Sequence, residues 1–229
     1  LESPFGTAES VLGGSAVYFS LAASLFCPVR LVSVVGEDFP PPHRRMLEER
    51  RIGLDGLVCM PGKTFRWHGR YRGSMNEAET REVQLNTFEN FLPTVPETYR
   101  ETPCVFLANS SPRTQMHVRR QLPGAQFVLA DTMDLWIETE KPALLELLAE
   151  LDALVLNDAE ARELSGAHNL LQAGRWVREH GPDYCIIKKA EHGAMLIGPQ
   201  GVFVLPGYPT EEVKDPTGAA DSFAGAMVG

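Results

Sequence analysis

The chain has little cysteine, and its cysteines are not clustered. Among 229 residues there are four cysteines and six histidines, which form neither a C-x-x-C pair nor the spacing of a Cys/His metal site. Scattered cysteines are typical of small core residues in a reducing compartment, so we expect a cytoplasmic protein without disulfides or structural zinc. The cysteines are Cys27, Cys59, Cys104 and Cys185.

Long hydrophobic runs and an excess of positive charge are also missing. No apolar stretch approaches the about 20 residues of a membrane span, and no charged leader precedes a signal-type segment. The chain carries 30 acidic and 21 basic residues, a formal net charge of -9. This balance argues against membranes and nucleic acids as partners. Hydrophobic residues make up 44%, enough for one sizeable core, and we expect a single domain over residues 1–229.

Two common nucleotide-binding motifs are absent. No G-x-G-x-x-G follows a predicted strand, so a dinucleotide-binding fold lacks its main support. The segment from Gly56 to Thr64 has some likeness to a P-loop. However, one residue too many separates Gly56 from Gly62, and the sequence after Thr64 predicts a hairpin where a P-loop requires a helix. We therefore discount a P-loop.

Apolar strands alternate with amphipathic helices along most of the chain. This alternation predicts a largely parallel sheet with helices on both of its faces. Sites in such sheets lie beyond the carboxyl ends of the strands. The predicted strands are 29–35, 104–108, 126–130, 153–156 and 184–187, and the predicted helices are 42–51, 141–151, 159–165 and 170–179.

Residues 62–88 break the alternation. Two stretches of alternating residues, 64–71 and 80–85, flank the polar run 73–79, which predicts a β-hairpin. An edge hairpin with solvated arginines is one interpretation of this region.

Residues 215–225, with the sequence D-P-T-G-A-A-D-S-F-A-G, carry the strongest chemical pattern. Pro216 stiffens the approach to a small-residue turn, and Gly218 helps to leave backbone N–H groups uncovered at a helix N-terminus, where anions bind. A carboxylate beside such donors can take a proton from a hydroxyl while the donors hold a phosphoryl group. The alternative is an ordinary N-capped helix with Asp221 in its first turn.

This segment resembles the C-terminal signature D-T-x-G-A-G-D-S-F of the PfkB, or ribokinase-like, carbohydrate kinases. Further motifs occur in the family's order, so the resemblance extends over nearly the whole chain. They are the paired glycines of Gly13-Gly14-Ser15-Ala16, the strand and G-x-D turn of residues 30–39 followed by Gly53-Leu54-Asp55, and the N-x-x-E motif Asn157-Asp158-Ala159-Glu160.

The resemblance implies a ribokinase-like three-layer α/β sandwich. Its central sheet would be mostly parallel with helices on both faces, and a small antiparallel lid or edge hairpin would occupy residues 62–88. In the family, antiparallel strands of this region flank the sugar site. Arg66, Trp67 and Tyr71 are therefore candidates to face a substrate.

The resemblance also implies ATP-dependent phosphoryl transfer to a hydroxyl of a sugar or sugar derivative. Asp221 would act as the general base that accepts the hydroxyl proton. The backbone N–H groups of Gly218, Ala219 and Ala220 would stabilise charge on the transferred group.

Cofactor contacts follow from the same resemblance. Asn157 and Glu160 lie one helical turn apart and would hold a hydrated Mg2+; capping of a helix is the alternative. Lys188 could reach a nucleotide phosphate, with surface solvation as the alternative. Asp215 and Thr217 match positions where some relatives bind a monovalent cation, such as K+.

Substrate contacts are assigned to glycines and strand ends. Gly13 and Gly14 would let a sugar lie close to the backbone. Asp38 would join the site or cap the next helix. Asn109 and Asp131 follow strands at the expected edge, and for each a turn-forming role is the alternative.

Three departures from the family pattern affect this assignment. Ser15 and Tyr18 stand where family members often carry asparagine, which puts a ribose-type hydrogen-bond set in doubt. Ala220 replaces the glycine before the base, and its methyl group is tolerable only if its φ is negative. Ala190 replaces a common glycine in the turn on the nucleotide side.

The family has an opening strand before the point that corresponds to Leu1 and further elements after Gly229, so we expect the chain to be truncated at both ends. Two alternatives to a sugar kinase stay open: a nucleoside (adenosine-type) kinase, and a catalytically silent relative that binds a sugar or nucleotide. The presence of Asp221 opposes the silent relative. A homodimer is left open.

Overall fold

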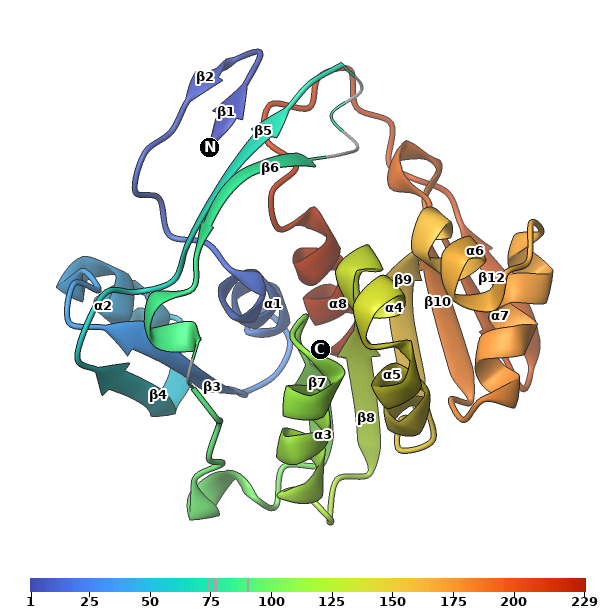
Figure 1. The fold of residues 1–229 in the computed structure, drawn as a ribbon, viewed down its shortest axis with the longest axis horizontal. Coiled ribbons are helices and arrows are strands. Elements are labelled where there is room, and N and C mark those ends of the chain that lie inside the picture. Colours follow the sequence, from blue (N-terminus) through green and yellow to red (C-terminus); the bar gives the residue numbers. More distant parts are fainter. Residues whose placement is uncertain (74, 76–77, 90) are drawn as a thin grey trace. The chain divides into compact units, whose positions relative to one another are not determined.

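The computed structural model describes residues 1–73, 75, 78–89 and 91–229 (Figure 1). The chain forms two compact units. Unit 1 comprises residues 1–96 and 210–229, and unit 2 is the continuous stretch 97–209. The expectation of a single domain over residues 1–229 stays a prediction.

Unit 2 is built on a six-stranded sheet with the order β12-β11-β10-β9-β8-β7. The four strands from β7 to β10 run parallel, and β11 and β12 add an antiparallel hairpin at one edge. The strands are β7 (Cys104–Leu107), β8 (Phe127–Asp131), β9 (Ala153–Asn157), β10 (Tyr184–Lys188), β11 (Ala194–Gly198) and β12 (Gly201–Leu205).

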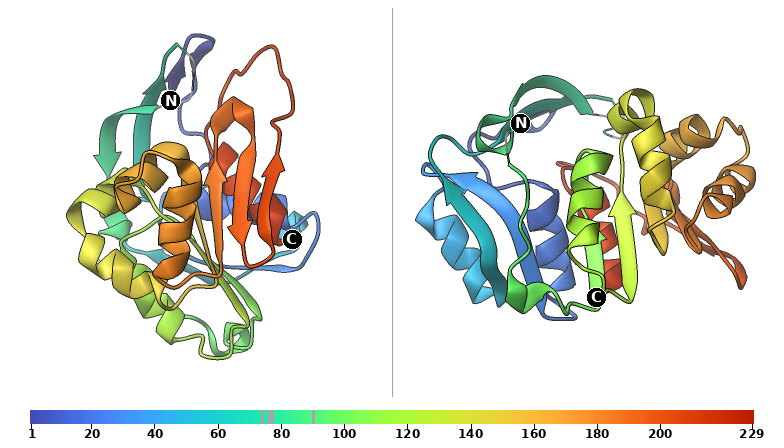
Figure 2. Two further views of the ribbon diagram at one scale, coloured as in Figure 1. Left: turned by 90° about the vertical axis from the view of Figure 1, so that its right-hand side faces the viewer. Right: turned by 60° about the horizontal axis from the view of Figure 1, so that its bottom comes forward.

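Helices connect the parallel strands of unit 2 and lie along one face of its sheet (Figures 1 and 2). The apolar residues of β9 and three leucines of α5, Leu144, Leu147 and Leu148, are fully inaccessible to solvent, so the core of this unit lies between helices and sheet. The helices are α3 (Pro112–Arg120), α4 (Asp134–Thr139), α5 (Lys141–Leu148), α6 (Asp158–Ser165) and α7 (Leu170–Glu179), with 3-10 turns at Glu97–Tyr99 and Ala190–His192.

Unit 1 contains a parallel pair of strands, β3 (Val29–Gly36) and β4 (Ile52–Met60), joined through α2 (Pro41–Glu49). A small core of Leu31, Leu47, Ile52 and Leu54 lies among these elements. Proline at the start of α2 supplies the fixed φ that favours a first helical turn.

A four-stranded sheet with the order β2-β1-β5-β6 also belongs to unit 1. Its hairpin consists of β5 (Arg66–Tyr71) and β6 (Ala78–Gln84), which pair antiparallel as the alternating sequence predicts. Ser74, Asn76 and Glu77 of the predicted connecting run lie outside the described residues. The short strands β1 (Glu2–Ser3) and β2 (Gly6–Thr7) complete the sheet, and a 3-10 turn follows at Asn86–Phe88.

Two helices of unit 1, α1 (Ser15–Ala23) and α8 (Ala219–Val228), pack against each other. A Cβ added to Gly225 would lie 2.4 Å from the carbonyl oxygen of Phe19, and one added to Gly229 would lie 2.9 Å from the Cβ of Phe26. The contacts thus advance in the same direction along both segments, from Gly225 of α8 and Phe19 of α1 to the residues that follow the two helices, so the helices run parallel. Both N-termini lie at the same end of the pair, and glycine at 225 permits the close approach.

No helix within the described ranges combines the length and the apolar character needed to cross a bilayer.

Candidate functional site

The residues assigned from the sequence fall into two groups, one in each unit. Unit 1 holds Gly13, Gly14, Asp38, Asp215, Thr217, Gly218, Ala219, Ala220 and Asp221. Unit 2 holds Asn109, Asp131, Asn157, Glu160 and Lys188.

The turn before α8 has the conformation of an anion-binding helix start. Gly218 is the N-cap and adopts a left-handed conformation with φ 75°, and no side chain caps the helix. The N–H of Ala219 donates to the carbonyl of Pro216 at 3.0 Å. Among the described residues, no acceptor is assigned to the N–H groups of Gly218 and Ala220. Of the three amides assigned from the sequence, that of Ala219 is thus engaged within the turn, and the other two have no assigned acceptor.

Ala220 lies inside α8 and has no positive φ, so its methyl group is compatible with the backbone at this position. Asp221 follows it in the first turn of the same helix and is half-buried. Just before the turn, Asp215 accepts a hydrogen bond from the N–H of Thr217 at 2.9 Å. This contact fixes the loop that leads into α8.

Two tyrosines lie close to the carboxylates of this turn. Burial raises the pKa of Tyr18, and the negative charges of Asp215 and Asp221 raise it further. Burial also raises the pKa of Tyr71, the same two carboxylates act in the same direction, and a hydrogen bond with Thr217 opposes them. The hydroxyl of Thr217 lies 3.4 Å from that of Tyr71. Both phenols therefore stay neutral at physiological pH and border the candidate base.

The paired glycines open α1 beside one of these tyrosines. Gly14 is the N-cap of α1 with φ 97°, a conformation that side chains disfavour, and both glycines are exposed. A Cβ on Gly13 would lie 3.7 Å from the hydroxyl oxygen of Tyr18. The segment assigned to the substrate and the turn assigned to the phosphoryl group thus share Tyr18 as a neighbour.

Asp38 is bonded within the protein. Its Oδ1 accepts hydrogen bonds from the N–H and the hydroxyl of Thr64, both at 2.7 Å, and its Oδ2 lies 3.4 Å from the guanidinium of Arg66. The bonds from Thr64 are the main cause that lowers the pKa of Asp38. Asp38 therefore ties the loop after β3 to the start of β5, and a substrate contact would have to share these bonds.

In unit 2, the candidate residues gather at the carboxyl ends of the parallel strands. Asp131, Asn157 and Lys188 are the last residues of β8, β9 and β10, and Asn157 pairs with Lys188 in the sheet register. Asn109 follows β7. The strand-end position expected for these residues is thus present at one edge of this sheet.

Asp131 and Lys188 form an ion pair at 3.4 Å, with side chains only 7% and 16% exposed. Beside them, burial raises the pKa of Glu160 to about 7; a hydrogen bond from the Asn157 backbone and the charge of Lys188 lower it, whereas Asp131 and Asp134 raise it. The positive charge of Lys188 thus interacts with two carboxyl groups, those of Asp131 and Glu160.

Asn157 and Glu160 form a capping box at the start of α6. The Asn157 side chain accepts from the Glu160 N–H at 2.8 Å, and the Glu160 carboxylate accepts from the Asn157 N–H at 2.6 Å. Capping, the alternative kept open from the sequence, is therefore one role of the pair. In the described part of the chain no group of three His, Cys, Asp or Glu side chains is arranged to hold a metal. The Asn157 amide and the Glu160 carboxylate therefore fit a hydrated Mg2+ that takes most of its other ligands from water and phosphate oxygens.

Asn109 is also engaged by neighbours. Its Oδ1 accepts from the indole N–H of Trp136 at 2.9 Å, and its amide nitrogen lies 3.1 Å from the sulfur of Met133. The loop after β7 is thereby fixed to the start of α4.

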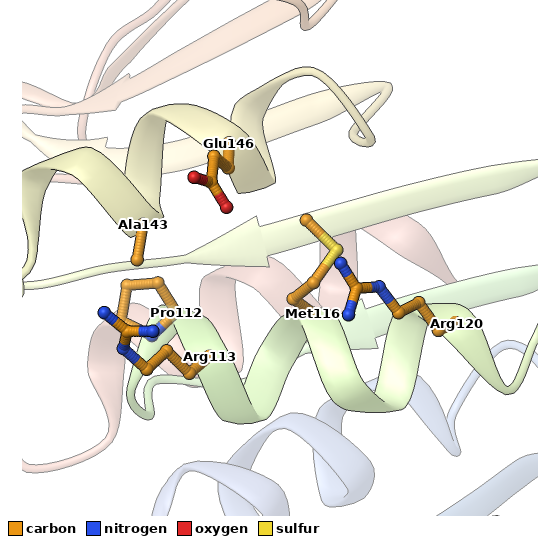
Figure 3. A pocket seen from close by; sticks show the side chains of 6 residues that line it. All are labelled: Pro112, Arg113, Met116, Arg120, Ala143 and Glu146. Carbon is orange, nitrogen blue, oxygen red and sulfur yellow. The ribbon is translucent and has the colours of Figure 1, made fainter.

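A cavity of about 230 Å3 lies between α3 and α5 (Figure 3). None of the residues assigned from the sequence lines it. It therefore adds nothing to the candidate site. Its lining residues are Pro112, Arg113, Met116, Arg120, Ala143 and Glu146.

Solved structures place the chain in the ribokinase-like fold. A putative ribokinase II from E. coli superposes with a TM-score of 0.83 in its ligand-free form, at 20% identity over 99% of this chain and 80% of that one. The same protein in complex with ATP and Mg2+ gives 0.77, at 19% identity over 100% and 82%. A Burkholderia thailandensis nucleoside kinase in complex with inosine gives 0.76, at 16% identity over 93% and 71%. The predicted fold class is confirmed.

The family follows from the sequence comparison. Residues 5–229 match the description pfkB family carbohydrate kinase, and the chain belongs to this family. It is also 26% identical over 233 aligned residues to the cytidine kinase of Thermococcus kodakarensis, covering 98% of this chain and 82% of that protein. The predicted membership of a kinase family is thus confirmed.

Proposed function

We propose that this chain transfers the γ-phosphoryl group of ATP to a hydroxyl of a small sugar or nucleoside. The acceptor oxygen forms a bond to the γ-phosphorus while the bond to the β,γ-bridging oxygen breaks and ADP leaves. Asp221 takes the proton of the acceptor hydroxyl as the new bond forms.

The observation that carries this proposal is the position of Asp221 in the first turn of α8. Next to it, the helix start has a left-handed glycine and two N–H groups without an assigned acceptor among the described residues. Such donors and the positive end of a helix favour negative charge, which develops on a transferring phosphoryl group. The carboxylate of Asp221 is suited to remove the proton, and the uncapped start of α8 is suited to stabilise the negative charge in the same step.

Unit 2 supplies the residues that we assign to the nucleotide. Lys188 carries the charge suited to a phosphate, and Glu160 is the carboxylate suited to a water ligand of Mg2+. When bound, Mg2+ would neutralise charge on the phosphates. We assign a monovalent cation such as K+ to Asp215 and Thr217, whose contact at 2.9 Å leaves one carboxylate oxygen outside that hydrogen bond.

On unit 1 we assign Gly13, Gly14 and Asp38 as candidate contacts of the acceptor. On unit 2, Asn109 and Asp131 are separate candidates for such a contact. Exposed glycines allow a polar ring to approach the backbone closely. A nucleoside is the second candidate acceptor, favoured by the similarity to a cytidine kinase along 98% of the chain.

An ATP-consumption screen over pentoses, hexoses, sugar acids and nucleosides tests the proposal. We expect turnover with at least one acceptor, and the class of that acceptor decides between the two candidates. No turnover with any acceptor, together with retained binding of a sugar or nucleotide, would favour a silent relative.

Asp221→Asn tests the base. This change keeps the shape of the side chain but removes the proton acceptor, so kcat should fall by about 10²-fold or more with unchanged thermal stability. The matched control is Asp183→Asn, which changes an exposed carboxylate of unit 2 that is assigned to no site. Parental turnover by Asp221→Asn would remove Asp221 from the mechanism. A cytoplasmic location stays a prediction, and a homodimer stays open.

A further inference from the structure

We propose that the aromatic ring of Tyr18 is a positioning element for the turn that opens α8, an inference that rests on the proposed function. Tyr18 lies in α1, four residues after the N-cap Gly14. Its ring holds the Gly218 turn in the left-handed conformation and at a fixed distance from the paired glycines. Tyr18 acts through the turn and is not itself a proton acceptor or phosphate ligand.

The contact between Tyr18 and Gly218 is closer than any residue with a side chain would permit. A Cβ built on Gly218 would lie 2.2 Å from both Cγ and Cδ2 of Tyr18. The ring therefore occupies the space that a side chain at 218 would need, directly against the backbone of the turn. Because Gly218 has φ 75°, the turn lacks the intrinsic preference that would keep it in place without such a contact.

The same ring also reaches the segment before α1. A Cβ on Gly13 would lie 3.7 Å from Cε2 and from the hydroxyl oxygen of Tyr18, which is an ordinary van der Waals distance. One rigid side chain thus spans from the glycine assigned to the acceptor to the glycine of the phosphoryl turn. Both contacts lie inside unit 1. A misplacement of about 1 Å between reacting groups can cost about 10²-fold in rate, so a rigid spacer at this point affects kcat.

The ring and the hydroxyl of Tyr18 have separable roles. The ring carries the contact with Gly218, whereas no hydrogen bond of the hydroxyl is needed for it. Tyr18→Phe keeps the ring and tests the hydroxyl alone. Tyr18→Leu removes the ring while it keeps an apolar side chain in α1. Tyr208→Leu is the matched control, because Tyr208 is 92% exposed and belongs to unit 2.

Steady-state kinetics with the acceptor found in the screen give the first readout. We expect Tyr18→Leu to lose about 10²-fold in kcat with acceptor KM within threefold. Tyr18→Phe should retain kcat within about twofold, and so should Tyr208→Leu. A kcat of Tyr18→Leu equal to the parental one would overturn the proposal. An equal loss in Tyr18→Phe would overturn it too, since the hydroxyl and not the ring would then be responsible.

Backbone relaxation of the Gly218 and Ala220 amides gives a second readout that does not depend on catalysis. In the parental chain both amides should have order parameters of about 0.85, and in Tyr18→Leu they should fall below about 0.6. Parental values already below about 0.6 overturn the proposal even if Tyr18→Leu does not fold. If no acceptor is phosphorylated, the proposed function fails, whereas rigid parental amides that loosen in Tyr18→Leu still support the role of the ring.

Discussion

Replacement of Glu160 by glutamine should stabilise the ligand-free chain above neutral pH. Burial raises the pKa of this carboxyl group to about 7, which means that the folded protein disfavours its charged form. Glutamine has no charge to desolvate. Its amide oxygen can still accept the hydrogen bond from the Asn157 N–H, now 2.6 Å from the carboxylate, so the cap of α6 is kept.

The size of the effect follows from the pKa of Glu160 in the two states. In the unfolded chain the pKa takes its usual value of 4.5, and in the folded chain it is about 7. Between these values the folded state retains a proton that the unfolded state has lost, so stability falls as pH rises and levels off above about pH 7. This difference in pKa corresponds to about 3 kcal/mol of folding free energy, which is about 6 to 12 °C in Tm for a chain of this size.

Thermal and urea unfolding of the parental chain and of Glu160→Gln from pH 5.5 to 8.5, without nucleotide or Mg2+, measure this difference. The advantage of the variant should grow with pH and then become constant. Glu163→Gln serves as the control, because Glu163 lies exposed on the same helix and its charge is already hydrated. A difference between Glu160→Gln and the parental chain that does not vary with pH would refute a buried, charge-disfavouring site for Glu160.

Two further predictions concern the metal and the helix pair. With an active acceptor, Glu160→Gln should raise the Mg2+ concentration for half-maximal rate several-fold, because a carboxylate suited to a metal-bound water is lost; an unchanged titration would leave Glu160 with its capping role alone. Gly225→Ala should lower stability by about 2 kcal/mol in thermal melts, because the new Cβ would lie 2.4 Å from the carbonyl oxygen of Phe19. Gly124→Ala is its control, with the nearest described atom 3.8 Å away, and equal melting of the two variants would contradict close packing at Gly225.

Much of the fold could be predicted because its strands and helices have strong local patterns. The predicted strand 153–156 is β9, and the predicted helix 170–179 is α7 with the same bounds. The sequence prediction did not include α3, which has a polar sequence. Its start, however, carries local signals: Ser111 caps it with its side chain, and Pro112 follows at the first helical position. The β11–β12 hairpin was also absent from the prediction. The turn between Gly198 and Gly201 was the available signal for it.

The candidate site was less predictable, because its neighbours are distant in sequence. The sequence motifs indicate a role for Gly218 and Asp221. No local pattern indicates that Tyr18 of α1 packs against Gly218, the N-cap of α8. Nor could spacing show that the Ala219 N–H donates to Pro216. At Ala190, where a glycine was expected, the backbone has φ 47°, so alanine holds a left-handed conformation there at some cost in strain.

The parallel pairing of α1 and α8 has a consequence for biosynthesis. All of unit 2 is translated between these two helices, and it is continuous in sequence, so it can fold while unit 1 still lacks α8. Until α8 leaves the ribosome, the face of α1 that it covers is exposed to solvent and chaperones. Contacts between segments that are distant in sequence form slowly, so nascent chains should acquire the Asp221 turn after unit 2 has folded.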